Sequence, residues 1–176
     1  MSRTNPFKKK RRQASKTLLV FGEGFGEEMF LKYLKSLYSY KSNVAITVKK
    51  GKGGDAQNIV IDADRTPGAF DRKIVILDND KAKVEMTKAR QEAKNRGIKL
   101  IENTPCLESL LISILDKKPA SKNSAWCKGE FESKYIEKKK RGELSEYIKL
   151  FPKKLLDGQR PKIPELDKLI SIMEGK

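Results

Sequence analysis

Short apolar runs alternate with segments of helical periodicity over residues 17–115, and this alternation limits the folds open to the chain. The clearest run, Ile74-Val75-Ile76-Leu77, indicates a strand buried on both faces of a sheet. Similar runs predict strands at residues 17–21, 44–48 and 98–101, and the intervening patterns predict helices at residues 27–38, 56–65, 81–96 and 107–115. Such repeated strand–helix units call for an α/β fold, with a mostly parallel four-stranded sheet flanked by helices as in Rossmann-like proteins.

Acidic residues follow the first and third predicted strands directly. Asp78 and Asp80 come after the buried run, and Glu23 comes after residues 17–21. Parallel α/β sheets bind ligands at the carboxyl ends of their strands, where the first and third strands are commonly neighbours. Residues i and i+2 of an extended segment point to the same side, so these three carboxylates can converge on one cation. An oxygen-rich site suits Mg²⁺ or Mn²⁺; the alternative is an Asp-rich turn or a helix cap.

The glycine-rich turn at residues 22–26 lies between a predicted strand and a predicted helix, which is also how a dinucleotide site begins. The third glycine of G-x-G-x-x-G is missing. Glu23, Glu27 and Glu28 would also repel a pyrophosphate at this place. A cation bound beside the turn explains these glutamates better than a dinucleotide does.

The composition excludes several catalytic classes. Without histidine, the chain has no Ser-His or Cys-His nucleophile pair and no histidine metal ligand. Cys106 and Cys127 lack C-x-x-C spacing and suggest a reduced, cytoplasmic setting. The sequence shows neither a secretory leader nor a membrane span, so it predicts a soluble cytoplasmic protein with no membrane partner.

A large excess of positive charge predicts nucleic acid as the partner, with attraction to an anionic membrane surface or simple solubility as the alternatives. Lys and Arg number 39 against 23 Asp and Glu, which gives a formal net charge of +16. The charge gathers in residues 1–16, in the loop 49–54, and in residues 117–141, where aromatic side chains are interspersed. The candidate nucleic-acid-binding residues are Lys8, Lys9, Lys10, Arg11, Arg12, Lys49, Lys50, Lys52, Lys138, Lys139, Lys140 and Arg141. The alternatives are a solvated tail for residues 1–16, a mobile turn for the loop 49–54, and aromatic anchors of an irregular segment for residues 117–141.

These patterns divide the chain into three parts. Residues 1–16 form a basic arm, and residues 17–116 form the α/β domain. Residues 117–176 form a basic helical extension packed on the same domain, with helices expected at residues 143–151 and 164–173.

Three motifs together resemble the RloB-like branch of TOPRIM-type domains. Glu23-Gly24-Phe25-Gly26-Glu27 with Phe30 resembles the opening E-G-x-[ST]-E-x-x-[YF] of that family, and Leu77-Asp78-Asn79-Asp80 resembles its D-x-D strand. The segment from Asn103 to Leu111 resembles its S-x-P-x-[FL]-E-x-W-[LF] helix start. The likeness covers about residues 8–115. The sequence departs from the pattern: Gly26 replaces a hydroxyl residue, Leu110 replaces an aromatic one, and the histidine that often closes this helix is absent.

The resemblance implies a Mg²⁺- or Mn²⁺-dependent nuclease that cleaves nucleic-acid phosphodiesters in a bacterial defence system, in some cases beside an ATPase subunit. It assigns Asp78 and Asp80 to metal binding and Glu23 to metal binding or acid–base work. Glu27 would support the catalytic site, and Glu108 would be a further metal ligand. The two glutamates can instead simply favour helix N-termini. The alternative function is a non-catalytic nucleic-acid-binding or nucleotide-sensing module that acts within a complex.

Overall fold

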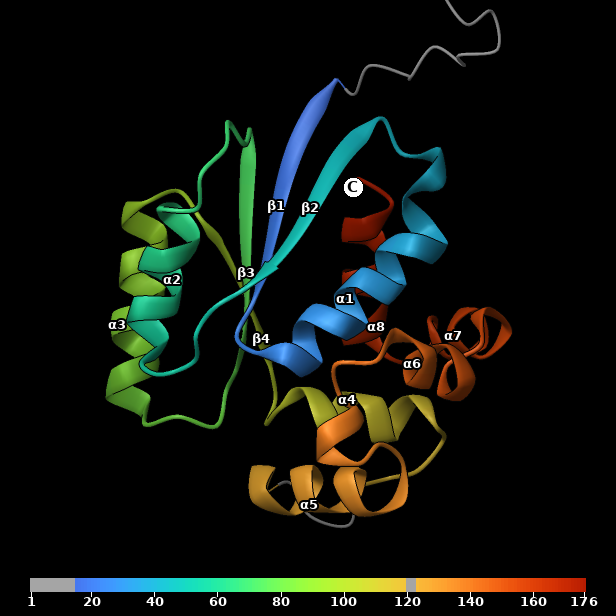
Figure 1. Cartoon of the computed structure of the whole chain (residues 1–176). Helices are drawn as coiled ribbons and strands as arrows, with labels where there is room; N and C mark the ends of the chain where they lie inside the picture. Colours follow the sequence, from blue (N-terminus) through green and yellow to red (C-terminus); the bar gives the residue numbers. More distant parts are fainter. Residues whose placement is uncertain (1–14, 120–122) are drawn as a thin grey trace, which may run out of the picture.

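The four predicted strands form one parallel sheet in the computed structural model, which describes residues 15–119 and 123–176 (Figure 1). The strands are β1 (Lys16–Gly22), β2 (Val44–Lys50), β3 (Arg72–Asp78) and β4 (Lys99–Asn103), in the order β2-β1-β3-β4. The prediction of an α/β, Rossmann-like fold with β1 beside β3 is therefore confirmed. The arm residues Lys8, Lys9, Lys10, Arg11 and Arg12 lie outside the described residues.

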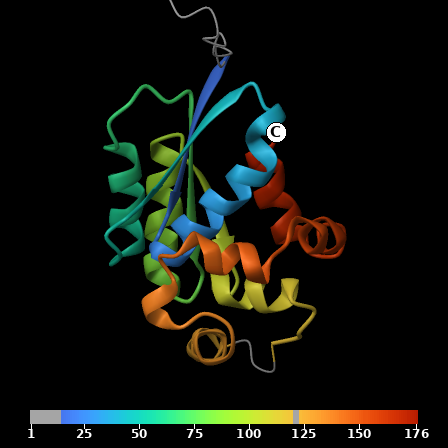
Figure 2. The same cartoon turned by 45° about the vertical axis from the view of Figure 1, so that its right-hand side comes forward.

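Helices cover both faces of the sheet, and each face has its own core (Figures 1 and 2). On one face, α2 (Ala56–Asp64) and α3 (Lys83–Asn95) bury a cluster that includes Leu19, Val75 and Leu77. On the other face, α1 (Phe25–Tyr38) and α8 (Pro164–Met173) pack over Val20 and Ile76. Alternate residues of β1 and β3 thus enter opposite cores, as their uninterrupted apolar runs require.

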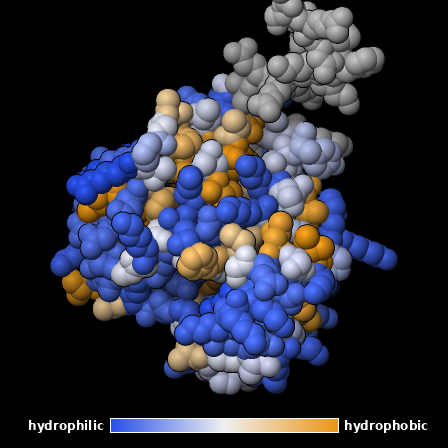
Figure 3. All heavy atoms as spheres, viewed as in Figure 1, coloured by the Kyte–Doolittle hydropathy of each residue, from blue (hydrophilic) through white to orange (hydrophobic). Residues whose placement is uncertain are grey.

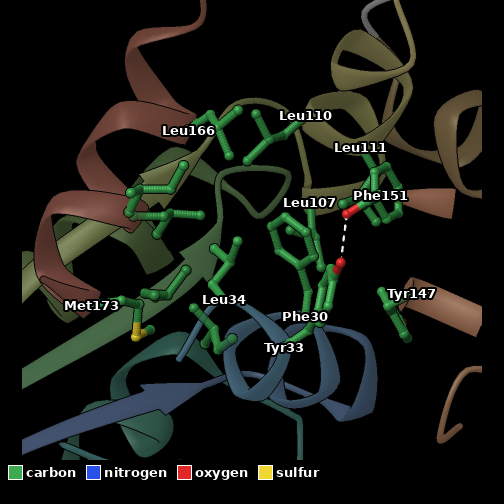
Figure 4. Packing of buried hydrophobic residues seen from close by; sticks show 14 of the residues in the cluster. Phe30, Tyr33, Leu34, Leu107, Leu110, Leu111, Tyr147, Phe151, Leu166 and Met173 are labelled. Carbon is green, nitrogen blue, oxygen red and sulfur yellow. Dashed lines mark hydrogen bonds between the residues drawn. The ribbon is translucent and has the colours of Figure 1, made fainter. Parts of the chain in front are cut away.

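Aromatic side chains join α1 to the carboxyl-terminal helices (Figure 4). The Phe30 ring lies 5.7 Å from the Phe151 ring in an edge-on arrangement and 6.3 Å from the Tyr147 ring. The Tyr33 hydroxyl donates a hydrogen bond of 2.6 Å to the backbone carbonyl of Phe151. The segment after residue 117 therefore contributes to the same core as the sheet.

The carboxyl-terminal part contains more helix than the sequence predicts. It comprises α4 (Leu107–Ile114), α5 (Ser124–Lys134), α6 (Leu144–Leu150) and α7 (Lys153–Gln159). The sequence predicts helices only at residues 143–151 and 164–173 of this part, so α5 and α7 were not expected. At the start of α5, Asn123 accepts a hydrogen bond of 2.8 Å from the Ala125 backbone N–H, and Phe131 is buried.

The carboxyl ends of all four strands meet at one edge of the sheet, next to α4 and α5 (Figure 1). The face of the molecule drawn in Figure 3 is mostly hydrophilic, in keeping with the charged composition. Within the described ranges, the helices are all too short or too polar to cross a membrane.

Candidate metal centre

A pocket of about 710 Å³ opens at the carboxyl ends of β1 and β3. Carboxylates from four elements face it, together with basic side chains of the carboxyl-terminal part. Its lining comprises Glu23, Gly24, Phe25, Gly26, Glu27, Gly53, Asp78, Glu108, Lys128, Glu132, Lys138, Lys139, Arg141 and Gly142. This carboxylate pocket thus contains Glu23, Glu27, Asp78 and Glu108, all of which the sequence analysis singled out.

The glycine turn after β1 places Glu23 and Glu27 beside each other. A Cβ atom at Gly22 would lie 2.6 Å from the Cβ atom of Glu27, so only glycine lets α1 start this close to the strand end. The Gly24 backbone N–H donates a hydrogen bond of 3.0 Å to Glu27 Oε2. Because Glu27 is buried and accepts this hydrogen bond, it fixes the turn that carries Glu23.

Glu23 has one paired and one unpaired carboxylate oxygen. Its Oε1 atom lies 3.1 Å from the Lys81 Nζ atom. Its Oε2 atom is buried and has no hydrogen-bond donor. A buried carboxylate oxygen without a donor is costly, and a cation at that position would offset the cost.

Asp78 ties the end of β3 to the start of α4. Its Oδ1 atom accepts a hydrogen bond of 2.9 Å from the Leu107 backbone N–H, and its Oδ2 atom lies 3.3 Å from Lys128 Nζ. Asp78 is only 4% exposed. The buried strand end therefore presents a carboxylate of fixed orientation to the pocket.

Burial raises the pKa of Asp78 to about 7, with the negative charges of Glu27 and Glu108 adding to the effect and the Lys128 ammonium opposing it. Burial likewise raises the pKa of Glu27, and the charges of Glu108 and Glu23 add to the shift. These carboxylates repel one another in a poorly solvated place. A divalent cation would remove that repulsion.

The raised pKa of Asp78 predicts an unusual pH dependence of stability in the presence of a chelator. Between the ordinary value of 3.8 and about 7, the folded protein retains a proton on Asp78 that the unfolded chain releases. The contribution of Asp78 to the free energy of unfolding is fully present below pH 4 and is lost as the pH rises to 7. We expect the unfolding free energy of the parent, relative to Asp78→Asn, to fall by a few kcal/mol over this range. Urea unfolding of both proteins in EDTA at several pH values measures this difference. If the unfolding free energies of parent and Asp78→Asn change with pH in parallel, the prediction is contradicted.

Asp80 does not share the carboxylate pocket. Its Oδ2 atom accepts a hydrogen bond of 2.6 Å from the Ser124 hydroxyl and lies 2.8 Å from Lys128 Nζ. Although burial opposes the shift, these two partners lower the pKa of Asp80. Glu23 and Asp78 therefore line one pocket, and Asp80, which does not line it, is linked to Asp78 through the Lys128 ammonium that both carboxylates contact.

Glu108 lies in the first turn of α4 and is buried. Its Oε1 atom lies 3.4 Å from an Arg141 guanidinium nitrogen, which in turn lies 2.8 Å from Glu132 Oε1. The Oε2 atom of Glu108 is buried and lacks a hydrogen-bond partner. The pocket thus holds two buried carboxylate oxygens without a donor, on Glu23 and Glu108, and the Nε atom of Arg141 beside Glu108 is likewise buried without an acceptor.

Cys106 is the other group near these carboxylates. Within the part of the chain that the structure describes, Asp78, Cys106 and Glu108 form the one group of three whose ligand atoms lie within 4.8 Å of one another. Burial raises the pKa of the Cys106 thiol to about 12, and the residue belongs to the apolar core. Because most of the surrounding donors are carboxylates, the site suits a hard divalent cation.

Seven of the candidate nucleic-acid-binding residues lie within the described part of the chain. Lys49, Lys50 and Lys52 line a second hollow of about 440 Å³, together with Phe21, Gly51, Asp62, Arg65, Thr66 and Pro67. We call this the lysine hollow. Lys138 and Lys139 line the carboxylate pocket, and Lys140 lies 3.3 Å from Glu137 Oε1. The side chain of Arg141 is mostly buried and faces Glu108 and Glu132.

Three residues of the site were not expected from the sequence. Lys128 and Glu132 lie on α5, a helix with few apolar residues to reveal its period, and Lys81 pairs with Glu23 across 58 positions of the chain. Each contact links segments far apart in the sequence. The packing of α5 against α4 brings Lys128 and Glu132 to the carboxylates, and Lys81 reaches Glu23 from the segment between β3 and α3.

Comparison with known proteins finds no match: no family model fits the chain, and no curated protein or solved structure is significantly similar to it.

Proposed function

We propose that the protein is a Mg²⁺- or Mn²⁺-dependent nuclease that hydrolyses phosphodiesters of nucleic acid, with its active centre in the carboxylate pocket. The observation that carries the proposal is that Asp78 and Glu108 have ligand atoms within 4.8 Å of one another in a pocket that Glu23 also lines with a buried, unpartnered oxygen. The likeness of three sequence motifs to RloB-like TOPRIM domains supports the same conclusion. It also supports a place in a bacterial defence system beside an ATPase or another subunit.

The residues of the pocket would have separate roles in this reaction. Glu23, Asp78 and Glu108 would hold the cation, and Glu27 would fix the turn that carries Glu23. The chemistry that such a cation supplies when bound is polarisation of a phosphoryl oxygen and activation of water. Lys128, Lys138 and Lys139 line the same pocket and would attract a phosphate that the carboxylates alone would repel.

A second candidate is a nucleic-acid-binding or nucleotide-sensing module without catalysis. The observation in its favour is the position of Lys128, whose ammonium group already neutralises Asp78 and Asp80 at distances of 3.3 and 2.8 Å. In that case Asp78 and Asp80 would stabilise the fold through their ion pairs with Lys128, and a metal cation would not be needed to neutralise them.

One assay tests the proposal and separates it from the second candidate. The purified full chain is incubated with single- and double-stranded DNA and RNA in Mg²⁺, Mn²⁺, Zn²⁺ or chelator. The proposal predicts cleavage of at least one substrate in Mg²⁺ or Mn²⁺ and none in chelator. Binding without cleavage under every condition would favour the non-catalytic module and contradict the proposal.

Lys128 should compete with the cation for Asp78. We expect Lys128→Met to increase Mn²⁺ affinity about fivefold, because an ion pair of this exposure contributes about 1 kcal/mol. Lys134→Met is the matched control, since Lys134 lies on the same helix and pairs with Glu130 instead. Calorimetric titration measures both variants. Equal Mn²⁺ affinities for parent and Lys128→Met would contradict this role.

A further inference from the structure

An exposed aromatic ring stands at the rim of the carboxylate pocket. Phe25 begins α1 and is 60% exposed, although the neighbouring aromatic residue of the helix, Phe30, is fully buried. Burying a phenylalanine side chain contributes about 1.5–3 kcal/mol, and Phe25 forgoes much of that contribution. The ring lies beside charged groups, so packing of the core does not account for its position.

Lys50 links this ring to the lysine hollow. Its Nζ atom lies 3.8 Å from the centroid of the Phe25 ring, while its side chain also lines the hollow that contains Lys49 and Lys52. Phe25 lines the carboxylate pocket. The two hollows therefore adjoin through one lysine–phenylalanine pair, in which Phe25 lines the carboxylate pocket and Lys50 lines the lysine hollow.

An aromatic ring next to a row of lysines matches an unpaired nucleotide chain, in which bases and phosphates lie next to one another. Aromatic rings bind bases by stacking, and a row of lysines follows the phosphates of the same strand. A base within a duplex is already stacked on its neighbours and would have to be extruded to reach the ring. An unpaired base can stack on the remaining exposed surface of Phe25, whereas a base within a duplex cannot reach this surface.

We propose that Phe25 stacks a base of single-stranded nucleic acid, and that Lys50 and the lysine hollow bind the adjoining phosphates. The inference rests on the proposed function and deepens it, because it names unpaired DNA or RNA as the substrate class of the same pocket. The strand would cross from the lysine hollow over Phe25 and bring a phosphodiester to the carboxylates.

The test measures binding by fluorescence anisotropy in EDTA, where cleavage does not interfere. Ligands are single-stranded DNA, single-stranded RNA, a DNA strand of equal length without bases, and a duplex. We expect Phe25→Ala to weaken binding of base-bearing single strands about tenfold, and to leave the strand without bases and the duplex unchanged. Phe25→Trp should retain binding. Val84→Ala, which truncates another exposed apolar side chain, should have no effect.

The results separate this inference from the nuclease proposal. Equal affinities of parent and Phe25→Ala for base-bearing strands, or equal losses with and without bases, would overturn the stacking role. Preferential binding of the duplex by the parent would also overturn it. If the parent shows base-dependent binding through Phe25 but cleaves nothing in Mg²⁺ or Mn²⁺, the stacking site stands and the nuclease proposal fails.

Discussion

Asp78→Asn should reduce the rate of Mg²⁺-dependent cleavage by about 10³-fold. A metal centre contributes several kcal/mol of transition-state stabilisation, and each step of about 1.4 kcal/mol is a factor of ten in rate. Asparagine keeps the acceptor for the Leu107 backbone N–H but loses the negative charge that faces the pocket. Single-turnover cleavage by parent and variant measures the effect, with thermal melting to check that both proteins are folded at the assay temperature.

Asp80→Asn is the matched control for that experiment. Both aspartates belong to the same D-x-D motif, but Asp80 is bound by Ser124 and Lys128 and does not line the carboxylate pocket. We expect a loss of about 10- to 100-fold, the scale typical of groups that support a metal ligand from outside. Equal losses for the two variants would show that Asp80 joins the catalytic centre. Unchanged cleavage by Asp78→Asn would refute the proposed mechanism.

Phe30→Ala should lower the free energy of unfolding by about 3–5 kcal/mol, the usual cost of removing a fully buried aromatic side chain. Phe30 has no exposed surface and packs against Tyr147 and Phe151. Its loss would open a cavity between α1 and the carboxyl-terminal helices (Figure 4). Such a change is a large part of the stability of a typical domain.

Phe25→Ala provides the comparison on the same helix. Because Phe25 is 60% exposed, its truncation should change stability by no more than about 0.5 kcal/mol. Urea or guanidinium unfolding of both variants measures the difference. Similar losses for Phe25→Ala and Phe30→Ala would contradict the assignment of Phe30 to the core and Phe25 to the pocket rim.

Much of the sheet could be predicted because its signals are local. The apolar run before Asp78 is buried on both faces, and the pairing of Gly22 with Ile76 places Glu23 near the end of β3, as expected for neighbouring strands. The helices around the sheet also lie near their predicted positions. For example, α3 spans Lys83–Asn95, within the predicted range 81–96.

The lysine that links Asp80 to Asp78 could not be predicted from an i, i+2 rule. That rule holds only while the backbone stays extended, and β3 ends at Asp78. The Asn79 backbone N–H still bonds to the Asn103 carbonyl at 2.8 Å, but beyond it the chain leaves the sheet. Asp80 then meets Ser124 and Lys128 of α5, a helix whose weak apolar pattern gave no sign of its position.

The most direct test of the account is an anomalous-difference map from crystals of the full chain grown with Mn²⁺. The account predicts an anomalous peak in the carboxylate pocket, bound by oxygens of Glu23, Asp78 and Glu108. Absence of a peak there at saturating Mn²⁺, or a peak only at outlying carboxylates such as Asp80, would contradict the central claim that these buried oxygens form a metal centre.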